Sequence, residues 1–270
     1  MNFDGKTTVV TGAAGGIGAA LARRFHAAGA RVVVADRDAD RLTAVAAELN
    51  AIRPDSALAV VADISTEKGN IALIDAAREK FGFIDLFFAN AGVAQGTDLE
   101  STDEDTWNSV MNINLHAHRW AAKHLLGEWL AAGEGYFCST ASAAGLLSQI
   151  GSATYSVSKH AAVAFAEWLS ITYGDRGIRV TTLCPQGVNT NMLNPPDATG
   201  IDKRGGDVVK ASGDVLEPEQ VADIVHDTIV AEKFLVMPHP EVHTFEQRKV
   251  ADRDRWLAGM RKLQARIIGG

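Results

Sequence analysis

Residues 7–18 read Thr7-Thr8-Val9-Val10-Thr11-Gly12-Ala13-Ala14-Gly15-Gly16-Ile17-Gly18, an apolar strand pattern that runs directly into a glycine-rich turn. Glycines in such a turn let the backbone approach a pyrophosphate, whose charge is met by the amides and the dipole at the start of the following helix. The same small residues also occur where a helix merely packs close to a strand. The turn therefore favours dinucleotide binding but does not establish it alone.

Six further short apolar runs, rich in β-branched residues, follow at intervals long enough for helices. They are Arg31–Ala35, Leu58–Ala62, Leu86–Ala89, Gly135–Ser139, Arg179–Leu183 and Phe234–Met237. Strands that alternate with helical crossovers form a parallel sheet, and the nearly continuous apolar character of these runs indicates burial on both faces. The sequence predicts one doubly wound α/β domain over residues 1–270, with a seven-stranded parallel sheet between two layers of helices.

Composition limits the class of partner. The 26 basic and 33 acidic residues give a net charge of -7, which creates no field that would attract nucleic acid or anionic lipid. Cys138 and Cys184 lie in strand-like runs without metal-ligand spacing, so we expect buried, reduced thiols. The histidines form no zinc motif, and no apolar run has the length of a signal core or a membrane span. We therefore expect a cytoplasmic protein that binds no metal, nucleic acid or membrane.

Two segments lie outside the regular alternation. Residues 191–216 hold two prolines, several glycines and scattered charges just past the sixth strand, where ligands of doubly wound sheets bind. We expect a substrate lid there, the alternative being a surface loop without a role. Residues 241–268 carry apolar residues at helical spacing, which predicts a C-terminal helical extension. It could cover the substrate, dock on a neighbouring subunit or pack on its own domain. These apolar residues are Trp256, Met260, Leu263 and Ile267.

Polar residues stand at the ends of several predicted strands. Asp36 ends the second strand, where a carboxylate can accept hydrogen bonds from the adenine ribose hydroxyls and would repel a 2′-phosphate. Arg37 could attract that phosphate, although it can equally lie over the adenine face or in solvent. Asp63 can accept from the adenine amino group, and Asn90-Ala91-Gly92 gives another close backbone approach. Each acid alone could simply cap a helix. Together they favour NAD over NADP.

Three residues downstream supply a proton-transfer site. Tyr155 and Lys159 lie four residues apart on a predicted helix, Ala153–Asp175, and therefore share one face. Lys159, together with a positive nicotinamide ring, can lower the pKa of the Tyr155 phenol, while Ser142 can hydrogen-bond a substrate oxygen. The alternative is an ordinary amphipathic helix with a half-buried ring and a solvated charge.

The combined motifs resemble the short-chain dehydrogenase/reductase family, in its compact single-domain form, over approximately Lys6–Met237. The resemblance implies a Rossmann fold, a homodimer or homotetramer, and an asparagine that holds a water in a proton relay. That asparagine is Asn114, with Asn112 as the nearby alternative. Gln186 replaces the family's usual glycine and either faces the site or points outward. The implied catalytic residues are Asn114, Ser142, Tyr155 and Lys159.

These inferences give two sets of candidate binding residues. The expected cofactor contacts are Gly12, Gly15, Gly16, Ile17, Gly18, Asp36, Arg37, Asp63, Ile64, Asn90, Ala91, Gly92, Tyr155, Lys159, Pro185, Val188 and Thr190. The expected substrate contacts are Ser142, Ala144, Gln149, Tyr155, Gln186 and Met192.

The predicted reaction is the NAD-dependent interconversion of a secondary alcohol and a ketone. Because the expected pocket is mainly apolar, we expect an aromatic, terpenoid, steroid or other lipid-like substrate. One alternative is a 3-oxoacyl-thioester reductase of the same family, which Asp36 and the acidic net charge disfavour. The other is a dinucleotide-binding sensor or scaffold without turnover, which the complete tetrad disfavours.

Overall fold

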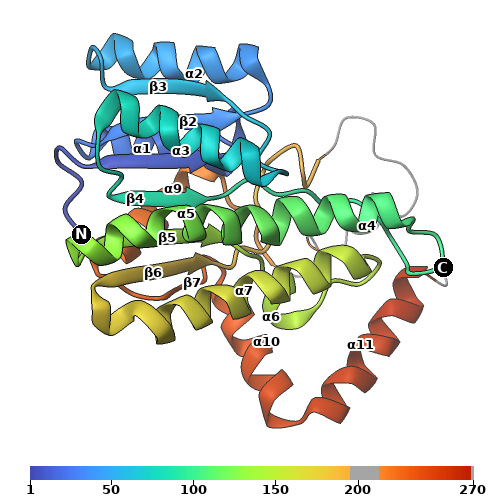
Figure 1. Cartoon of the computed structure of the whole chain (residues 1–270). Coiled ribbons are helices and arrows are strands. Elements are labelled where there is room, and N and C mark those ends of the chain that lie inside the picture. The colour runs from blue at the N-terminus through green and yellow to red at the C-terminus, as the bar shows by residue number, and fades with distance from the viewer. Residues whose placement is uncertain (195–208, 210–212, 269–270) are drawn as a thin grey trace.

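Seven parallel strands form a single sheet in the order β3-β2-β1-β4-β5-β6-β7 (Figure 1). The structure is a computed structural model and describes residues 1–194, 209 and 213–268. The strands are β1 (Thr7–Thr11), β2 (Arg31–Asp36), β3 (Ala57–Val61), β4 (Leu86–Ala89), β5 (Gly135–Thr140), β6 (Ile178–Leu183) and β7 (Leu235–Val236). The predicted doubly wound sheet is thus confirmed. Its strand order reverses between β1 and β4, and ligands bind at such switch points.

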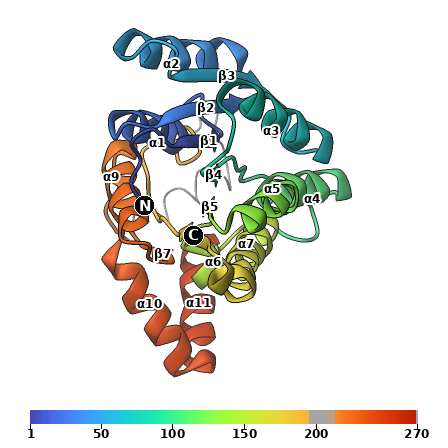
Figure 2. The ribbon, with the colours of Figure 1, turned by 60° about the vertical axis from the view of Figure 1, so that its left-hand side comes forward.

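Helices cover both faces of the sheet. In chain order they are α1 (Gly16–Ala27), α2 (Ala39–Ile52), α3 (Glu67–Phe81), α4 (Glu104–Met111), α5 (Ala117–Ala132), α6 (Ala144–Leu147), α7 (Ala153–Tyr173), α9 (Pro218–Val230), α10 (Pro240–Ala251) and α11 (Arg253–Ile268). A π-helical turn, Asn112–His116, joins α4 to α5, and a 3-10 turn, Gly174–Arg176, follows α7. Figure 2 shows α1 and α9 on one side of the sheet and α3, α5 and α7 on the other.

Neighbouring strand residues point to opposite faces, which explains why the strands are apolar throughout. Val10 and Phe88 pack in the core under α1, α2 and α9. Val9 and Phe87, one residue earlier in each strand, pack under α3, α5 and α7. Both faces of the sheet are therefore buried against helices.

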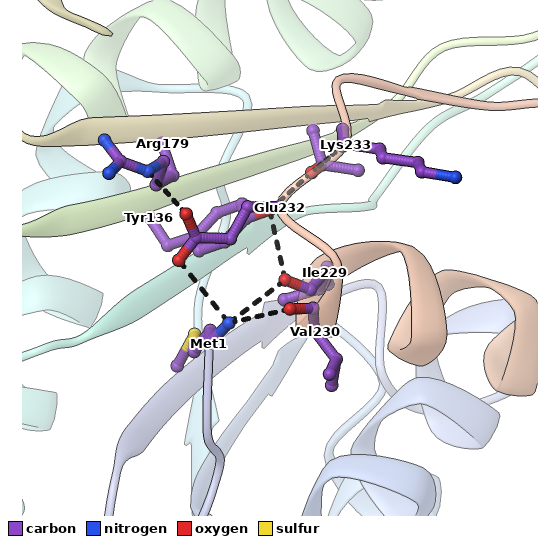
Figure 3. A network of polar contacts seen from close by, with 8 residues as sticks. Met1, Tyr136, Arg179, Ile229, Val230, Glu232 and Lys233 are labelled. Atoms are coloured by element: carbon purple, nitrogen blue, oxygen red, sulfur yellow. Dashed lines mark hydrogen bonds and ion pairs between the residues drawn. The ribbon is translucent and has the colours of Figure 1, made fainter. Parts of the chain in front are cut away.

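A polar network links the N-terminus and the end of α9 to the amino ends of β5 and β6 (Figure 3). The amino group of Met1 donates to the backbone oxygens of Ile229 and Val230 at 3.3 and 3.2 Å, and Glu232 pairs with Arg179 at 2.8 Å. Burial raises the pKa of Tyr136 in this network. These contacts lie at the edge opposite the carboxyl ends of the strands, so they join elements without shaping a ligand site.

The C-terminal extension is formed by α10 and α11, which project from the body of the domain beyond β7 (Figure 1). On α10, the Lys249 ammonium donates to the backbone oxygen of Leu146 in α6. By contrast, none of residues 253–267 in α11 is buried.

Most of the expected lid, residues 191–216, lies outside the described residues. Of its described part, Leu216 donates its backbone N–H to the Gly187 oxygen at 3.0 Å and accepts from Asn189 at 2.9 Å. Among the described helices, none combines the length and apolar character that crossing a bilayer requires.

The packing of α1 against the turn after β1 can be tested with two alanine substitutions. In Gly18→Ala the new Cβ would lie 2.1 Å from the Gly12 oxygen, so we expect a loss of about 1–3 kcal/mol of unfolding free energy. Gly127→Ala is the control, because this exposed helical glycine has open space around it and alanine should add about 0.5–1 kcal/mol. Urea unfolding of both variants measures the difference. Equal stability would contradict the close contact.

Candidate functional site

A cavity of about 1140 Å³ runs along the carboxyl ends of the strands. Its lining includes every residue that the sequence predicted to contact cofactor or substrate. The glycine-rich turn and the ends of β2 and β3 form one end, and Ser142, Tyr155 and Lys159 form the other. Asn114 does not line the cavity among the described residues and lies behind Gly92. Residues spread over most of the chain thus meet in one continuous space.

The turn after β1 can hold an anionic group. Gly12 has φ +68, and a Cβ there would lie 2.9 Å from the Ala91 Cα, so only glycine fits. Gly15 is the N-cap of α1 and supplies no side-chain cap, and the first turn of α1 holds no acidic residue. The amides at this helix start therefore face the cavity without competition from an acidic side chain of their own helical turn. This arrangement fits a pyrophosphate.

Asp36 is fixed at the end of β2 by backbone amides. Its Oδ2 accepts from the Ala14 N–H at 3.1 Å, and its Oδ1 accepts from the Arg37 and Asp38 N–H groups at 2.7 and 3.1 Å. Asp63, two residues after the end of β3, accepts from the backbone N–H and the hydroxyl of Ser65 through Oδ1. Both carboxylates line the cavity.

Two arginines that sequence reasoning missed also line this end of the cavity. Arg23 pairs with Glu48 at 2.8 Å, and Arg41 pairs with Asp38 at 3.5 Å. Both guanidinium groups already have carboxylate partners. The sequence could have shown that both arginines lie on helices. It could not have shown how close their guanidinium groups lie to the glycine-rich turn.

The side chain of Asn90 joins three strands. Its Nδ2 donates to the Thr11 backbone oxygen at 2.9 Å, its backbone N–H donates to the Thr11 hydroxyl at 3.0 Å, and its Oδ1 accepts from the Thr140 hydroxyl at 2.9 Å. The sequence suggested only a close backbone approach at this position. The sequence signal that could have indicated this role of the side chain is a polar residue at the carboxyl end of each of three adjacent strands.

The end of the cavity formed by Ser142, Tyr155 and Lys159 is densely hydrogen-bonded. The Lys159 side chain is 2% exposed, and its ammonium donates to the Thr140 backbone oxygen at 2.8 Å and lies 5.6 Å from the centroid of the Tyr155 ring. The Ser142 hydroxyl accepts from the Ala144 N–H at 3.1 Å and donates to the Pro185 oxygen at 3.5 Å. A Cβ on Gly92 would lie 3.1 Å from the Lys159 ammonium, so a larger residue there would press against that ammonium.

Burial governs protonation at this end. It raises the pKa of the Tyr155 phenol, which interaction with the Ser142 hydroxyl partly offsets, and it lowers the pKa of Lys159 to about 8. Burial also raises the pKa of Cys184 to about 12. The lysine therefore does not by itself bring the phenol toward neutral pH, because desolvation of the phenolate is the larger effect.

Asn114 lies in the π-helical turn and is fully buried. Its Oδ1 accepts from the Val93 N–H at 2.9 Å, and its Nδ2 donates to the Val93 oxygen and the Ser158 hydroxyl at 2.9 and 3.0 Å. Both polar atoms of the side chain are thus used within the protein. Asn112 stands at the partly exposed start of the same turn.

His118, which the sequence did not single out, is buried near Lys159. Neither ring nitrogen has a partner within the described part of the chain, and burial, aided by the Lys159 charge, lowers its pKa to about 3. Over residues 1–194, 209 and 213–268, no group of three or more carboxylate, histidine or cysteine side chains could hold a metal ion.

Comparison with known proteins identifies the family of this chain. Residues 6–200 match the family model described as short chain dehydrogenase. The chain is 35% identical over 225 residues to the meso-2,3-butanediol dehydrogenase of Serratia marcescens, covering 83% of this chain and 87% of that protein. It is also 35% identical over 244 residues to the 1-deoxy-11-beta-hydroxypentalenate dehydrogenase of Streptomyces exfoliatus, covering 89% and 86%.

Among solved structures, a short-chain dehydrogenase/reductase from Burkholderia phymatum in complex with NAD superposes with a TM-score of 0.86 at 28% identity. The superposition covers 94% of this chain and 96% of that one. The chain therefore belongs to the short-chain dehydrogenase/reductase family.

Proposed function

We propose that this protein is an NAD-dependent oxidoreductase that interconverts a hydrophobic secondary alcohol and a ketone. One observation carries the proposal: the turn that fits a pyrophosphate and the Ser142, Tyr155 and Lys159 side chains line the same cavity. The named relatives are dehydrogenases of hydroxyl compounds, which supports the reaction class. Their substrates differ, so the substrate of this chain is inferred from its own cavity.

The cavity fits an extended dinucleotide with its adenosine end at Asp36. The α1 amides would hold the pyrophosphate, the Asp36 carboxylate would accept from the ribose hydroxyls, and Lys159 would donate to the second ribose. Pro185, Val188 and Thr190 also line the cavity and would contact the nicotinamide. A carboxylate repels a 2′-phosphate, and Arg23 and Arg41 already have acidic partners, so NAD is preferred. When bound, NAD supplies the two-electron acceptor for the hydrogen on the carbinol carbon.

The chain's own residues move the proton. The Ser142 hydroxyl would donate to the substrate oxygen, and the Tyr155 phenolate would take the hydroxyl proton during oxidation. The Lys159 ammonium would favour the phenolate that takes up this proton, and a cationic nicotinamide would add to this effect. Because both side-chain polar atoms of Asn114 are occupied, its backbone carbonyl would hold the relay water.

The substrate end of the cavity favours an apolar alcohol. Its lining there is mainly aliphatic, with two amide side chains and, among the described residues, no basic group except Lys159. A phosphorylated or sugar substrate would leave polar groups without partners in this space. The lining residues are Ala144, Gln149, Ile150, Gln186, Met192 and Leu193.

Tyr155→Phe tests the role of the phenol. Loss of general-base catalysis should lower turnover of secondary alcohols by about 10²–10⁴-fold while the NAD dissociation constant stays within about twofold. Initial rates of NADH formation and fluorescence titration measure the two quantities. Tyr173→Phe, a partly exposed tyrosine at the end of the same helix, is the control. Undiminished turnover in the Tyr155 variant would remove the phenol from the mechanism.

Asp36→Asn tests the cofactor choice. Loss of the charge should lower the ratio of kcat/KM for NAD to that for NADP by about 10–100-fold, the effect of one hydrogen bond to a charged group. Asp40→Asn, at an exposed position in the first turn of α2, should leave the ratio unchanged. A wild-type preference for NADP would show that the neighbouring arginines outweigh Asp36.

The raised pKa of Tyr155 predicts opposite pH profiles for the two directions of reaction. Oxidation needs the phenolate, which is scarce below the raised pKa, so its rate should increase from pH 6 into the alkaline range. Ketone reduction needs the protonated phenol and should be fastest at the lower pH. Since Tyr155 and Lys159 interact, the observed pKa values belong to the pair. Steady-state rates of both directions, measured between pH 6 and 10, test this prediction. An oxidation rate that falls as the pH rises would contradict it.

A further inference from the structure

His239 connects the C-terminal extension to the candidate site. It lies between β7 and α10, where it is the N-cap residue of α10, and it is 1% exposed. Its Nδ1 lies 3.1 Å from the backbone nitrogen of Gln186, and its Nε2 lies 2.9 Å from the backbone oxygen of Gly187. A backbone N–H only donates and a backbone oxygen only accepts, so the partners require a neutral ring with its proton on Nε2.

The Pro185–Gln186 peptide links this ring to Ser142. The N–H of that peptide faces His239, and its carbonyl oxygen accepts from the Ala143 N–H at 2.8 Å and from the Ser142 hydroxyl at 3.5 Å. Because a peptide unit is planar, fixing its N–H also fixes the direction of its carbonyl oxygen. Hydrogen bonds in such a series also polarise one another. The imidazole thus sets the position of a group that contacts the Ser142 hydroxyl.

We propose that His239 is a positioning residue that orients the Ser142 hydroxyl through the Pro185–Gln186 peptide. The inference rests on the proposed function, in which Ser142 bonds the substrate oxygen. His239 does not appear among the described residues that line the cavity, so it acts through the peptide and not on the substrate.

A second contact of α10 supports this role. The Lys249 ammonium donates to the Leu146 backbone oxygen and lies 3.4 Å from the His160 Nε2. His160 is the residue that follows Lys159 in α7. The helix therefore contacts segments that follow both β5 and β6, and these two segments flank the substrate end of the cavity. Of the three roles expected for the extension, α10 has the third, because it packs on its own domain. There it contacts the segments beside the candidate site.

The two nitrogen atoms of His239 differ in importance. The Gly187 oxygen also accepts from the Leu216 N–H at 3.0 Å, so it keeps a partner when the imidazole is removed. The Gln186 N–H has no second partner in the described part of the chain. The Nδ1 acceptor is consequently the atom that matters. Asparagine places an oxygen at the Nδ1 position, whereas leucine has a similar branched shape and no acceptor.

His239→Asn and His239→Leu therefore form a matched pair. We expect the leucine variant to lose about tenfold or more in kcat for alcohol oxidation, with an NAD dissociation constant within about twofold of wild type. The asparagine variant should keep kcat within about threefold. Hydrogen exchange of the Gln186 amide should be faster in the leucine variant only. His243→Leu, at an exposed position on α10, controls for a general effect on that helix.

Each outcome decides the question. Equal loss of kcat in both variants, in step with their melting temperatures, would show that His239 serves stability alone. Full activity of the leucine variant, or equal exchange of the Gln186 amide in both variants, would also overturn the proposal. If the wild-type protein forms no NADH, the proposed function fails, while the amide-exchange comparison still tests the hydrogen bond.

Discussion

The hydrogen bonds of the Asn90 side chain hold the carboxyl ends of β1, β4 and β5 in register, and both halves of the candidate site depend on them. The amide donates to Thr11 on one side and accepts from Thr140 on the other. The Thr140 backbone oxygen in turn accepts from Lys159. On the opposite side, a Cβ at Gly18 would lie 2.7 Å from the Asn90 amide nitrogen. One side chain at the switch point thus lies between the glycine-rich turn and the backbone oxygen that accepts from Lys159.

Desolvation favours the neutral form of four titratable groups at and around Tyr155 and Lys159. It raises the pKa of Tyr155 and Cys184 and lowers that of Lys159 and His118. A site of this kind has little charge of its own, so a cation introduced beside Tyr155 acts at low dielectric and strongly favours the phenolate. In the proposed mechanism the oxidised nicotinamide is that cation. Proton uptake by Tyr155 is then coupled to the occupancy of the cofactor site.

The parallel sheet could be predicted from the sequence because burial on both faces leaves an apolar run at every strand. The predicted ends of β1 and β4 agree with the structure, and the other strand ends differ by at most one residue, as at β2, which extends to Asp36, because hydrogen bonding between strands sets them. The helix predicted over Ala153–Asp175 ends at Tyr173, where a 3-10 turn begins. The candidate residues could be found from motif spacing, but the roles of the Asn90 side chain and of His239 could not. Their partners lie about 50 or more residues away in sequence and meet only in the fold.

In the proposed reaction the substrate carbon transfers its hydrogen directly to NAD in this cavity. Mass spectrometry can test it with hydrophobic secondary alcohols that carry deuterium on the carbinol carbon. The account predicts that the NADH formed is heavier by one deuterium and that the rate shows a primary isotope effect or is limited by product release. Formation of unlabelled NADH from the deuterated alcohol, together with ketone, would contradict direct transfer and with it the proposed reaction.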